Sequence, residues 1–469
     1  MQNNGQSRRT FLKNMGTSLA ALTVSGCESL AGKASKKPNF VMIFTDDQGY
    51  QDVGCFDSPL IKTPNLDRMA NEGTRFTDFC SANSVCSPSR ASLMTGCYPT
   101  RVSIYNVIFP YDNWGLNPKE ITVAELLKTQ GYATACIGKW HLGHKPEFLP
   151  TRQGFDYYYG IPYSNDMHIN PEMKLADNIN LREAVTVESI KTDKPKQNWV
   201  PLMENEEIIE YPCDQSTLTK RYTEKGLKFI DDNKDRPFFL YVPYTMPHVP
   251  LSASDDFKGK SMRGLYGDAI EEIDWGVGQI LKKLKTLGLD DNTMVIFASD
   301  NGPWLQMKEN GGCALPLRGG KFETYEGGIR VPCIMRWPGK IPAKRICNQL
   351  CSTIDILPTF AQLAGYEVPA DRVIDGKNIW PLISGKANAK SPHDDFYYYR
   401  AEVLEVVRSG QWKLRKVKEN VELYDLKNDI SEKIDLAEKK PELVNQLLAK
   451  MEAFDKELNN SKRPAGKVK

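Results

Sequence analysis

The chain has 469 residues, in which 61 Lys and Arg residues nearly balance 59 Asp and Glu residues and leave a formal net charge of +2. This balance argues against nucleic acid or an anionic surface as the partner. The length exceeds that of one typical domain and is sufficient to bury a large hydrophobic core. The 11 cysteines are scattered without regular spacing, which is not the pattern of a disulfide framework.

The first 27 residues are similar to an export signal. Residues 7–13 (SRRTFLK) resemble a twin-arginine signal, and the apolar run over residues 16–26 is too short to span a bilayer. Residues 24–27 (VSGC) resemble a lipobox, in which Cys27 becomes the lipidated N-terminus after cleavage. A plain signal peptide that is cut nearby, with Cys27 incidental, is the alternative.

These segments predict an exported bacterial protein with a signal peptide over residues 1–27 and a basic tether over residues 28–38. We expect the twin-arginine export machinery as a partner and a location in the periplasm or on a membrane as a lipoprotein. The membrane is then contacted only through the lipid anchor, because no second apolar segment reaches transmembrane length.

The first predicted element of the fold is a buried parallel strand. Residues 39–45 (NFVMIFT) form a nearly continuous apolar run, which is typical of a strand covered on both faces. The run ends in Asp46 and Asp47, and two adjacent carboxylates are costly to hold together without a cation. Oxygen ligands of this kind suit Ca²⁺ or Mg²⁺, although an isolated Asp-Asp pair more often lies in a solvated turn.

A helix opened by Thr63 and Pro64 leads to the stretch CSPSRASLMTG, residues 86–96. If a helix begins near Pro88, its free N–H groups face an anion, and Arg90 adds a permanent positive charge close by. The alternative is that Cys86 is only a small buried hydrophobic residue.

Two further candidate residues follow a second predicted strand. A capping box from Thr122 to Glu125 begins a helix, and residues 132–137 then predict a strand. Lys139 and His141 come directly after this strand and point to the same side. In an open α/β sheet this is the end where ligands bind.

Residues 155–214 are polar, rich in aromatic residues and irregular, as expected of a long loop that carries recognition. Asp166 and His168 lie in this segment and are candidates for contact with a sugar hydroxyl, while simple packing within the loop is the alternative.

The same arrangement recurs in the second half of the chain. A helix over residues 217–230 and a strand over residues 237–245 precede His248, which lies between two prolines. An amphipathic helix with apolar residues from Tyr266 to Leu284 leads to a strand over residues 293–299. That strand ends in Asp300 and Asn301, which again present oxygen ligands at a strand end, and Lys321 follows in a Gly-Gly-Lys turn.

After a strand over residues 332–337 and a helix over residues 354–363, the pattern changes to short antiparallel strands. They are predicted over residues 396–399, 403–408, 412–417 and 421–424, and a closing amphipathic helix follows. We therefore expect one domain over residues 39–369, a smaller α+β domain over residues 370–458 and a disordered basic tail over residues 459–469.

Six segments in this order resemble the type I sulfatases, the formylglycine-dependent, Cys-type family that includes arylsulfatase A and N-acetylgalactosamine-6-sulfatase. The resemblance covers residue 39 to about residue 425 and rests on segments that contain the following residues: Asp46 and Asp47; Cys86 and Arg90; Lys139 and His141; His248; Asp300 and Asn301; Lys321. It implies an alkaline phosphatase-like α/β sandwich with a large mixed, mostly parallel sheet, plus the smaller antiparallel domain.

The resemblance also implies a mechanism. A formylglycine-generating or radical sulfatase-maturing enzyme oxidises Cys86 to formylglycine, whose hydrate attacks the sulfur of a sulfate ester. One Ca²⁺ is held by Asp46, Asp47, the modified Cys86, Asp300 and Asn301. Arg90, Lys139 and Lys321 neutralise the sulfate. His248, with Lys321 as a second candidate, protonates the leaving oxygen, and His141 takes the proton of the second hydroxyl.

The expected function is therefore removal of sulfate from a sulfated mono- or oligosaccharide, with arylsulfatase activity on small esters. Two alternatives stay open. Relatives with the same metal-carrying fold cleave phosphate mono- or diesters, typically with Ser or Thr as nucleophile, and an unmodified Cys86 would leave a sulfated-glycan binder without catalysis.

Overall fold

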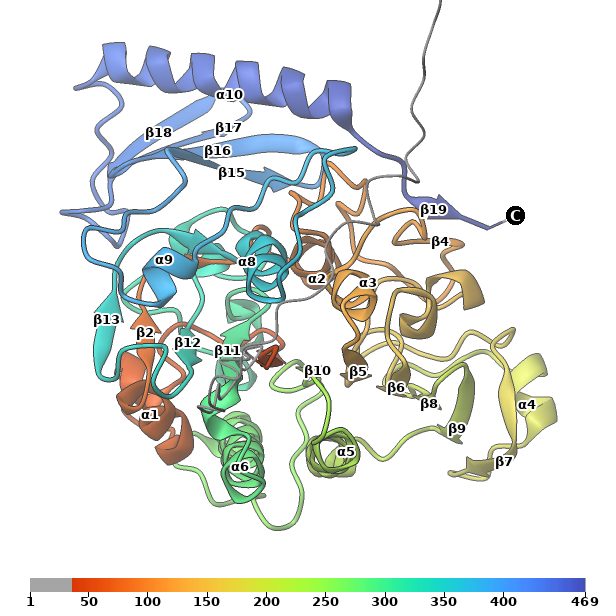
Figure 1. Ribbon diagram of the computed structural model, residues 1–469. Coiled ribbons are helices and arrows are strands. Elements are labelled where there is room, and N and C mark those ends of the chain that lie inside the picture. Colours follow the sequence, from red (N-terminus) through yellow and green to blue (C-terminus); the bar gives the residue numbers. More distant parts are fainter. Residues whose placement is uncertain (1–35, 469) are drawn as a thin grey trace, which may run out of the picture. The chain divides into compact units, whose positions relative to one another are not determined.

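The strand β1 (Asn39–Thr45) lies in the middle of an 11-stranded mixed sheet, as the computed structural model shows (Figure 1). It pairs in parallel with β10 (Phe238–Pro243) on one side and with β11 (Thr293–Ser299) on the other. The sheet order is β13-β2-β12-β11-β1-β10-β5-β6-β8-β9-β7. The other strands are β2 (Thr74–Phe76), β5 (Ala133–Ile137), β6 (Tyr157–Gly160), β7 (Leu175–Leu181), β8 (Leu202–Glu204), β9 (Glu207–Tyr211), β12 (Cys333–Arg336) and β13 (Arg345–Cys347).

The structure describes residues 36–468, of which residues 37–468 belong to one compact unit. The predicted signal peptide, the lipidation site Cys27 and most of the tether lie outside the described residues. Within the described part of the chain, no helix combines the length and the apolar character needed to cross a membrane.

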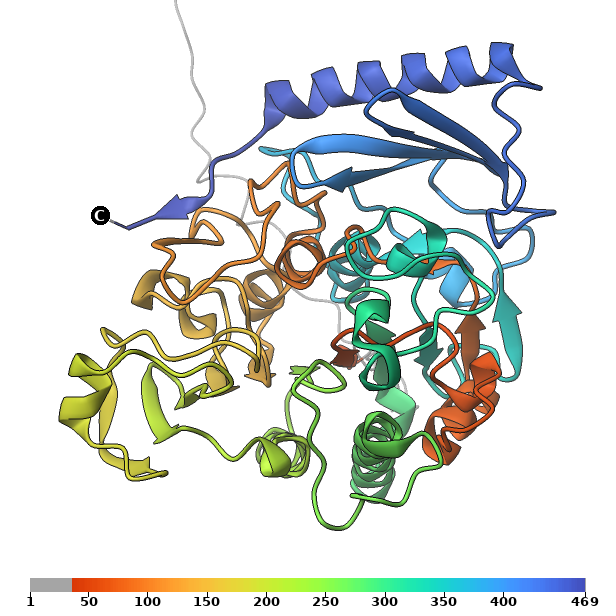
Figure 2. The same ribbon diagram turned by 180° about the vertical axis from the view of Figure 1, so that it is seen from behind.

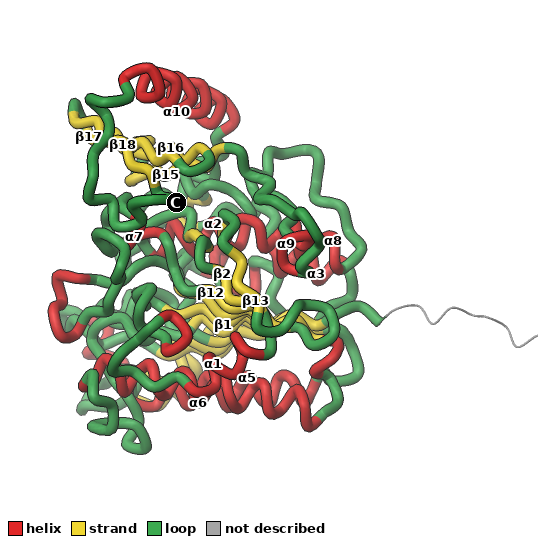
Figure 3. The backbone as a smooth tube through the Cα atoms, turned by 90° about the vertical axis from the view of Figure 1, so that its left-hand side faces the viewer, coloured by secondary structure: helices red, strands yellow, loops and turns green. Residues whose placement is uncertain are grey.

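Helices cover both faces of the sheet, which explains the continuous apolar run of β1. Phe40, Met42 and Phe44 belong to the core on one face, whereas Val41 and Ile43 belong to the core on the other. Figure 3 shows the sheet between these two layers. The helices of one layer are α1 (Pro64–Asn71), α5 (Leu218–Asp232) and α6 (Gly264–Thr286), and those of the other are α2 (Cys86–Thr95), α3 (Val123–Thr129) and α8 (Ile356–Leu363).

A separate four-stranded antiparallel sheet follows near the C-terminus, and Figures 1 and 2 show one long helix, α10 (Pro441–Ser461), along it. Its strands are β15 (Asp395–Arg400), β16 (Val403–Ser409), β17 (Trp412–Val417) and β18 (Asn420–Asp425). The predicted fold class, a large mostly parallel sheet with a smaller antiparallel one, is confirmed. The domain boundary at residue 370 stays a prediction. Shorter elements are β3 (Phe79–Cys80), β4 (Trp114–Gly115), β14 (Cys351–Ser352), β19 (Gly466–Lys467), α4 (Val187–Thr192), α7 (Glu326–Ile329) and α9 (Trp380–Ile383).

The helices and strands predicted with explicit bounds are present, with ends shifted by at most two residues. Residues 155–214 differ from the expectation of an irregular loop, because they contain β6, β7, β8 and β9. These strands have three to seven residues each and extend one edge of the large sheet. Such short strands carry too little alternation to be told from a polar loop by sequence.

The helix caps are partly as predicted. At α3, Thr122 Oγ1 accepts a hydrogen bond from the Glu125 backbone N–H at 3.1 Å, which confirms the capping box. Thr63 does not cap α1, because its hydroxyl oxygen accepts from the backbone N–H of Gly54 at 2.7 Å. The carboxylate of Asp274 on α6 instead accepts from the backbone N–H groups of Asn65 and Leu66 at the start of α1.

The expectation of a disordered tail from residue 459 is wrong for residues 459–468. α10 continues to Ser461, and β19 pairs antiparallel with β4. Between them, Arg463 donates from Nε to Glu120 Oε1 at 2.7 Å and from Nη2 to Glu120 Oε2 at 3.0 Å. Because Glu120 is 343 positions away in the sequence, the local basic composition gives no indication of this partner.

Candidate active site

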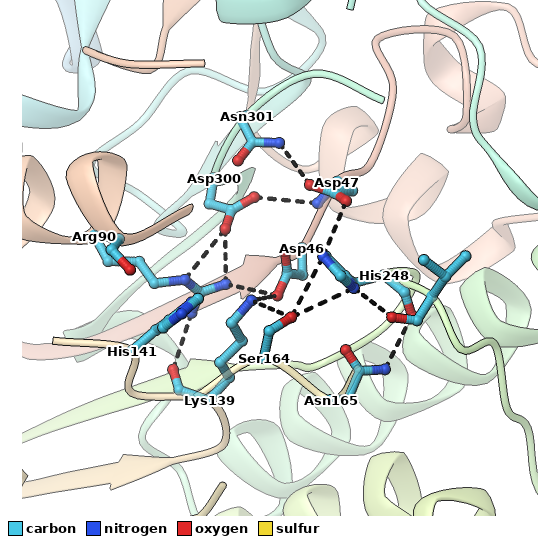
Figure 4. A network of polar contacts seen from close by, with 12 residues as sticks. Asp46, Asp47, Arg90, Lys139, His141, Ser164, Asn165, His248, Asp300 and Asn301 are labelled. Carbon is cyan, nitrogen blue, oxygen red and sulfur yellow. Dashed lines mark hydrogen bonds and ion pairs between the residues drawn. The ribbon is translucent and has the colours of Figure 1, made fainter. Parts of the chain in front are cut away.

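The predicted site residues follow the carboxyl ends of four adjacent parallel strands. Asp46 and Asp47 follow β1, Lys139 and His141 follow β5, His248 follows β10, and Asp300 and Asn301 follow β11. Figure 4 shows the side chains of these residues converging with that of Arg90 from α2. The structure thus brings together residues that are up to 255 positions apart, as expected for parallel strands whose ends share one sheet edge.

Asp46 is fully buried between two cations. Its Oδ2 lies 2.5 Å from Lys139 Nζ and 3.2 Å from Arg90 Nη2, and all three side chains are inaccessible to solvent. Burial alone would raise the pKa of Asp46, but Lys139 and Arg90 hold this pKa well below its usual range. Asp46 is therefore ionised, and it contributes a permanent negative charge to the site.

The neighbouring carboxylate of Asp300 has a different environment. Arg90 donates to Asp300 Oδ2 from Nε at 3.1 Å and from Nη2 at 2.8 Å. Burial and the negative charge of Asp46 nevertheless raise the pKa of Asp300 to about 7. Several carboxylates held this closely favour an additional cation, because each one raises the cost of ionising the next.

Asp47 contacts three other residues of the site. Its Oδ1 accepts from Asn301 Nδ2 at 2.7 Å, and its Oδ2 accepts from Lys321 Nζ at 2.7 Å. His248 Nε2 lies 3.5 Å from the same Oδ2. Lys321, predicted from a weak Gly-Gly-Lys signal, is therefore part of the network.

Cys86 is the first residue of α2 and is buried. Burial raises the pKa of its thiol, while the nearby positive charges of Lys139 and Lys321 lower it. The N-terminal N–H groups of α2 and these two cations surround the position of the Cys86 side chain with positive potential. This environment suits an anionic ligand at Cys86, as the sequence predicted.

Among the described residues, one ring nitrogen of His141 bonds to the backbone and the other does not. His141 Nε2 lies 3.1 Å from the carbonyl oxygen of Ile108, which can only accept, so Nε2 carries the proton. His141 Nδ1 is buried and has no hydrogen-bond partner within residues 36–468. Burial and the charges of Lys139 and Arg90 hold the pKa of His141 well below its usual range. His141 is therefore neutral, with a free lone pair on Nδ1.

Three residues at or next to the site have a left-handed backbone conformation. Asp47, His141 and Phe322, which follows Lys321, have φ values of 59°, 60° and 72°. Non-glycine residues rarely adopt this left-handed region, and such strain clusters at functional sites. Gly138, directly before Lys139, has a φ of 141°, and a Cβ added there would lie 1.9 Å from the Pro243 carbonyl oxygen. The close approach of β5 and β10 at this point therefore requires glycine.

The oxygen atoms of the site fit a hard divalent cation. Asp46, Asp47 and His248 each offer a ligand atom within 4.8 Å of the others. Asp46 Oδ1 and Asn301 Oδ1 are buried and have no hydrogen-bond partner in the described part of the chain. Burying an oxygen without a partner is costly, and binding a cation offsets that cost. With the carboxylates of Asp47 and Asp300 they form the oxygen-rich donor set that Ca²⁺ prefers.

Ser164 is a site residue that sequence reasoning missed. Its Oγ accepts from Lys139 Nζ at 3.3 Å and lies 3.3 Å from His248 Nε2, so it connects two predicted residues. The adjacent Asn165 donates from Nδ2 to the carbonyl oxygen of His248 at 3.0 Å. The only sequence signal was the position of this polar pair shortly after a strand, and β6 was not predicted.

The structure does not bring Asp166 and His168 into the network within residues 36–468. His168 Nδ1 lies 2.9 Å from the carbonyl oxygen of Ile169, and the Asp166 carbonyl accepts from the Asn198 backbone N–H. A role for these two residues in substrate binding stays a prediction.

The sequence profile of the sulfatase family matches residues 38–366, and that of the C-terminal region of N-sulphoglucosamine sulphohydrolase matches residues 320–457. N-acetylgalactosamine-6-sulfatase of Mus musculus is 40% identical over 412 residues, which are 84% of this chain and 74% of the relative. Arylsulfatase A of Homo sapiens is 40% identical over 389 residues, which are 81% of this chain and 75% of the relative.

The fold comparison agrees. The crystal structure of Ps i-CgsB superimposes with a TM-score of 0.78 at 33% identity, over 90% of this chain and 93% of that chain. A phosphonate monoester hydrolase of Agrobacterium radiobacter shares the fold at 19% identity, with a TM-score of 0.62 over 89% of this chain and 96% of that chain. The predicted alkaline phosphatase-like architecture is thus confirmed, and the chain belongs to the sulfatase family of hydrolases.

Proposed function

We propose that the protein hydrolyses sulfate esters of a sulfated carbohydrate through a formylglycine made from Cys86. The observation that carries this proposal is the position of Cys86 at the buried N-terminus of α2, close to Lys139 and Lys321. An ordinary structural cysteine does not need this positive environment, whereas a nucleophile that attacks an anionic ester does.

The other residues of the site have separate roles in the reaction. The hydrated formylglycine supplies a nucleophilic hydroxyl. Arg90, Lys139 and Lys321 are buried cations that neutralise the sulfate in a site of low dielectric constant. His141 Nδ1 is unprotonated because Nε2 donates to Ile108, so His141 accepts a proton at Nδ1.

His248 is the proposed acid. Its Nδ1 lies 2.5 Å from the carbonyl oxygen of Val249 and donates to it, so Nε2 carries a proton only in the imidazolium form. Burial and the charge of Lys321 lower the pKa of His248 in the free protein. An anionic sulfate ester beside the ring raises this pKa again, which favours the acid when substrate is bound. Lys321 is the second candidate donor.

One Ca²⁺ is the proposed metal. Asp46, Asp47, Asp300 and Asn301 would hold it together with an oxygen of the modified Cys86. The ion would supply positive charge next to the sulfate. The donor set described above supports this assignment, because it leaves two buried oxygen atoms without partners.

The carbohydrate substrate class is supported by the relatives. One is named N-acetylgalactosamine-6-sulfatase, and a structure of Ps i-CgsB was determined in complex with k-i-k-neocarrahexaose. The arrangement of Cys86, Pro88 and Arg90 discriminates against the phosphatase alternative, in which Ser or Thr is the typical nucleophile.

Sulfate release is the direct test. The protein is co-expressed with a formylglycine-generating enzyme or a radical sulfatase-maturing enzyme, and the aldehyde at position 86 is verified by mass spectrometry. Aryl sulfate and sulfated galactose, N-acetylgalactosamine, glucosamine and fucose are offered, with a phosphate ester and the Cys86→Ala variant as controls. We expect release from at least one sulfate and none from Cys86→Ala. Turnover of phosphate alone supports the phosphatase alternative, and silence on every ester with verified aldehyde contradicts the proposed reaction.

We also propose export by the twin-arginine machinery and lipidation at Cys27. The motifs at residues 7–13 and 24–27 support this proposal. Mass spectrometry of the mature N-terminus and membrane fractionation of wild type and Cys27→Ala test it. Recovery of Cys27→Ala in the membrane fraction to the same extent as wild type contradicts lipid anchoring.

A further inference from the structure

A groove of about 570 Å³ lies beside the nucleophile position and is not explained by the sulfate-binding residues. Its lining includes Ser84 and Val85, directly before Cys86, and Phe322, directly after Lys321. The Phe322 backbone N–H donates to the Ser84 carbonyl at 3.1 Å, which joins these two segments. The groove therefore begins where the sulfate-binding residues end.

The loop over residues 103–113 forms another wall. Its Ile108 carbonyl accepts from His141, and its Ile108 N–H donates to Ser87 Oγ at 3.2 Å, so the loop is fixed against the site. Phe109 and Tyr111 from this loop stack with ring centroids 5.3 Å apart and an interplanar angle of 6°. Their exposed fractions are 38% and 72%, so this pair of large aromatic side chains is open to solvent at the groove.

Arg400, at the turn between β15 and β16, contributes the charge of the groove. This turn is held near Cys86 because Asn83 Nδ2 donates to the Tyr399 carbonyl at 3.0 Å. Arg400 is exposed, and among residues 36–468 its side chain makes no hydrogen bond or ion pair. The Asp112 carboxylate, which also lines the groove, accepts from the Phe109 backbone N–H at 2.6 Å.

A second cavity adjoins the groove. This cavity of about 590 Å³ shares Tyr105, Asn106 and Trp114 with the groove and is lined further by Lys462 and Lys467 of the C-terminal segment. Lys462 pairs with Glu402 at 2.6 Å, whereas exposed Lys467 has no ion pair within the described residues. Arg400 therefore lines the groove and Lys467 lines the adjoining cavity, and neither side chain has an ion pair within the described residues.

We infer that this groove and the adjoining cavity bind the neighbouring sugar units of an anionic oligosaccharide, with Phe109 and Tyr111 against sugar rings and Arg400 and Lys467 against further sulfate or carboxylate groups. The inference rests on the proposed function, since it places the sulfate that is cleaved at Cys86. Aromatic faces pack against the apolar faces of sugars, and unpaired cations bind anions without first breaking an ion pair. The substrate is thus an oligosaccharide or polymer with at least one anionic group besides the sulfate that is removed.

Binding to Cys86→Ala protein tests this inference independently of turnover. Calorimetric titration compares a sulfated monosaccharide with hexasaccharides of sulfated galactan, sulfated fucan and a sulfated glycosaminoglycan, and with an unsulfated polyuronate hexasaccharide. We expect at least one sulfated or carboxylated hexasaccharide to bind more tightly than the monosaccharide. Comparison of the sulfated hexasaccharides with the polyuronate shows whether the groove prefers sulfate or carboxylate groups. A rise in the dissociation constant with salt is also expected.

Variants assign the effect to the groove. Arg400→Ala and Lys467→Ala should each weaken hexasaccharide binding by roughly threefold to tenfold, and Arg400→Lys should retain most of it. Monosaccharide binding by these groove variants should equal that of wild type. The control Lys258→Ala removes an exposed charge outside the groove and should bind both the monosaccharide and the hexasaccharides as wild type does. Hexasaccharides that bind no more tightly than the monosaccharide, or that bind Arg400→Ala and Lys467→Ala as wild type, overturn the inference.

The two proposals fail separately. If matured wild type releases sulfate but the groove variants bind normally, the reaction stands and the inference is wrong. If matured wild type releases no sulfate but hexasaccharide binding depends on Arg400, the groove stands and the proposed reaction is wrong.

Discussion

Arg90 donates two hydrogen bonds to one oxygen of Asp300, from Nε at 3.1 Å and from Nη2 at 2.8 Å, and neither side chain is accessible to solvent. Arg90 belongs to α2, which begins with Cys86, and Asp300 follows β11. This pair therefore fixes the helix that carries the nucleophile to the sheet edge that carries the proposed metal ligands. Arg90 Nη1 also donates to the carbonyl oxygen of Lys139 at 2.9 Å, which links α2 to the residues after β5.

Replacement of Arg90 should destabilise the protein strongly. Arg90→Ala leaves Asp46 and Asp300 buried without their guanidinium partner, and breaking a buried pair in this way costs about 3–5 kcal/mol. Guanidinium unfolding in the presence of a chelator measures the change without compensation by a bound cation. Arg152→Ala, which removes an exposed pair with Glu206, is the control and should cost less than about 1 kcal/mol. Equal unfolding midpoints for Arg90→Ala and wild type would contradict this role.

Ser164 should affect turnover more than stability. Ser164→Ala removes the hydroxyl between Lys139 Nζ and His248 Nε2, and loss of one such positioning contact lowers kcat by about tenfold or more. The net loss of stability should be about 1 kcal/mol. Steady-state kinetics of the matured enzyme and thermal unfolding separate the two effects. Ser254→Ala is the control, because it removes a serine hydroxyl outside the network of Lys139 and His248. An unchanged kcat in Ser164→Ala would show that the contact is incidental.

Calcium should stabilise the folded protein. A ligand that binds only the native state at 100 times its dissociation constant adds about 2.7 kcal/mol, so Tm should fall on chelation and recover with Ca²⁺. Differential scanning calorimetry measures this response. Asp47→Asn should reduce the response to Ca²⁺, whereas Asp255→Asn, an exposed acidic residue away from the site, should retain it. A wild-type Tm that ignores both chelator and Ca²⁺ would rule out the metal site.

The C-terminal segment should hold the wall of the substrate groove. Arg463→Ala leaves the nearly inaccessible carboxylate of Glu120 unpaired, which costs about 1–3 kcal/mol. Hydrogen exchange at Trp114 and Gly115, which pair with β19, should become faster than in wild type. Lys228→Ala, which removes an exposed pair with Asp232, is the control and should leave exchange unchanged. Slow exchange at β4 in Arg463→Ala would mean that β4 does not depend on this segment.

Local sequence patterns identified the central elements because their physical causes are local. The apolar run of β1 reflects burial on two faces, and the capping box of α3 involves residues three positions apart. Seven of the site residues are likewise indicated locally, because each follows a predicted strand: Asp46, Asp47, Lys139, His141, His248, Asp300 and Asn301. Their convergence followed from the general rule that parallel strands present their carboxyl ends at one edge.

Contacts between distant segments were not predictable in this way. The start of α1 is capped by Asp274, which is 209 positions from Asn65. Ser164 lies in a segment that the sequence predicts as a loop but that contains short strands. In both cases the polar residue is visible in the sequence, but no local pattern indicates which distant residue it contacts.

Most of the central strands and helices, the residue types at the strand ends and the family resemblance can be inferred from sequence, because they depend on residues that are close in the chain. Which side chains meet is a property of the tertiary fold. The fold places Ser164 between Lys139 and His248. It also builds the groove from the loop before Cys86, the 103–113 loop, Phe322 and the turn at Arg400, with the C-terminal segment lining the adjoining cavity. The reason is physical: such contacts arise when separate elements pack around the common core, and no local pattern records that packing.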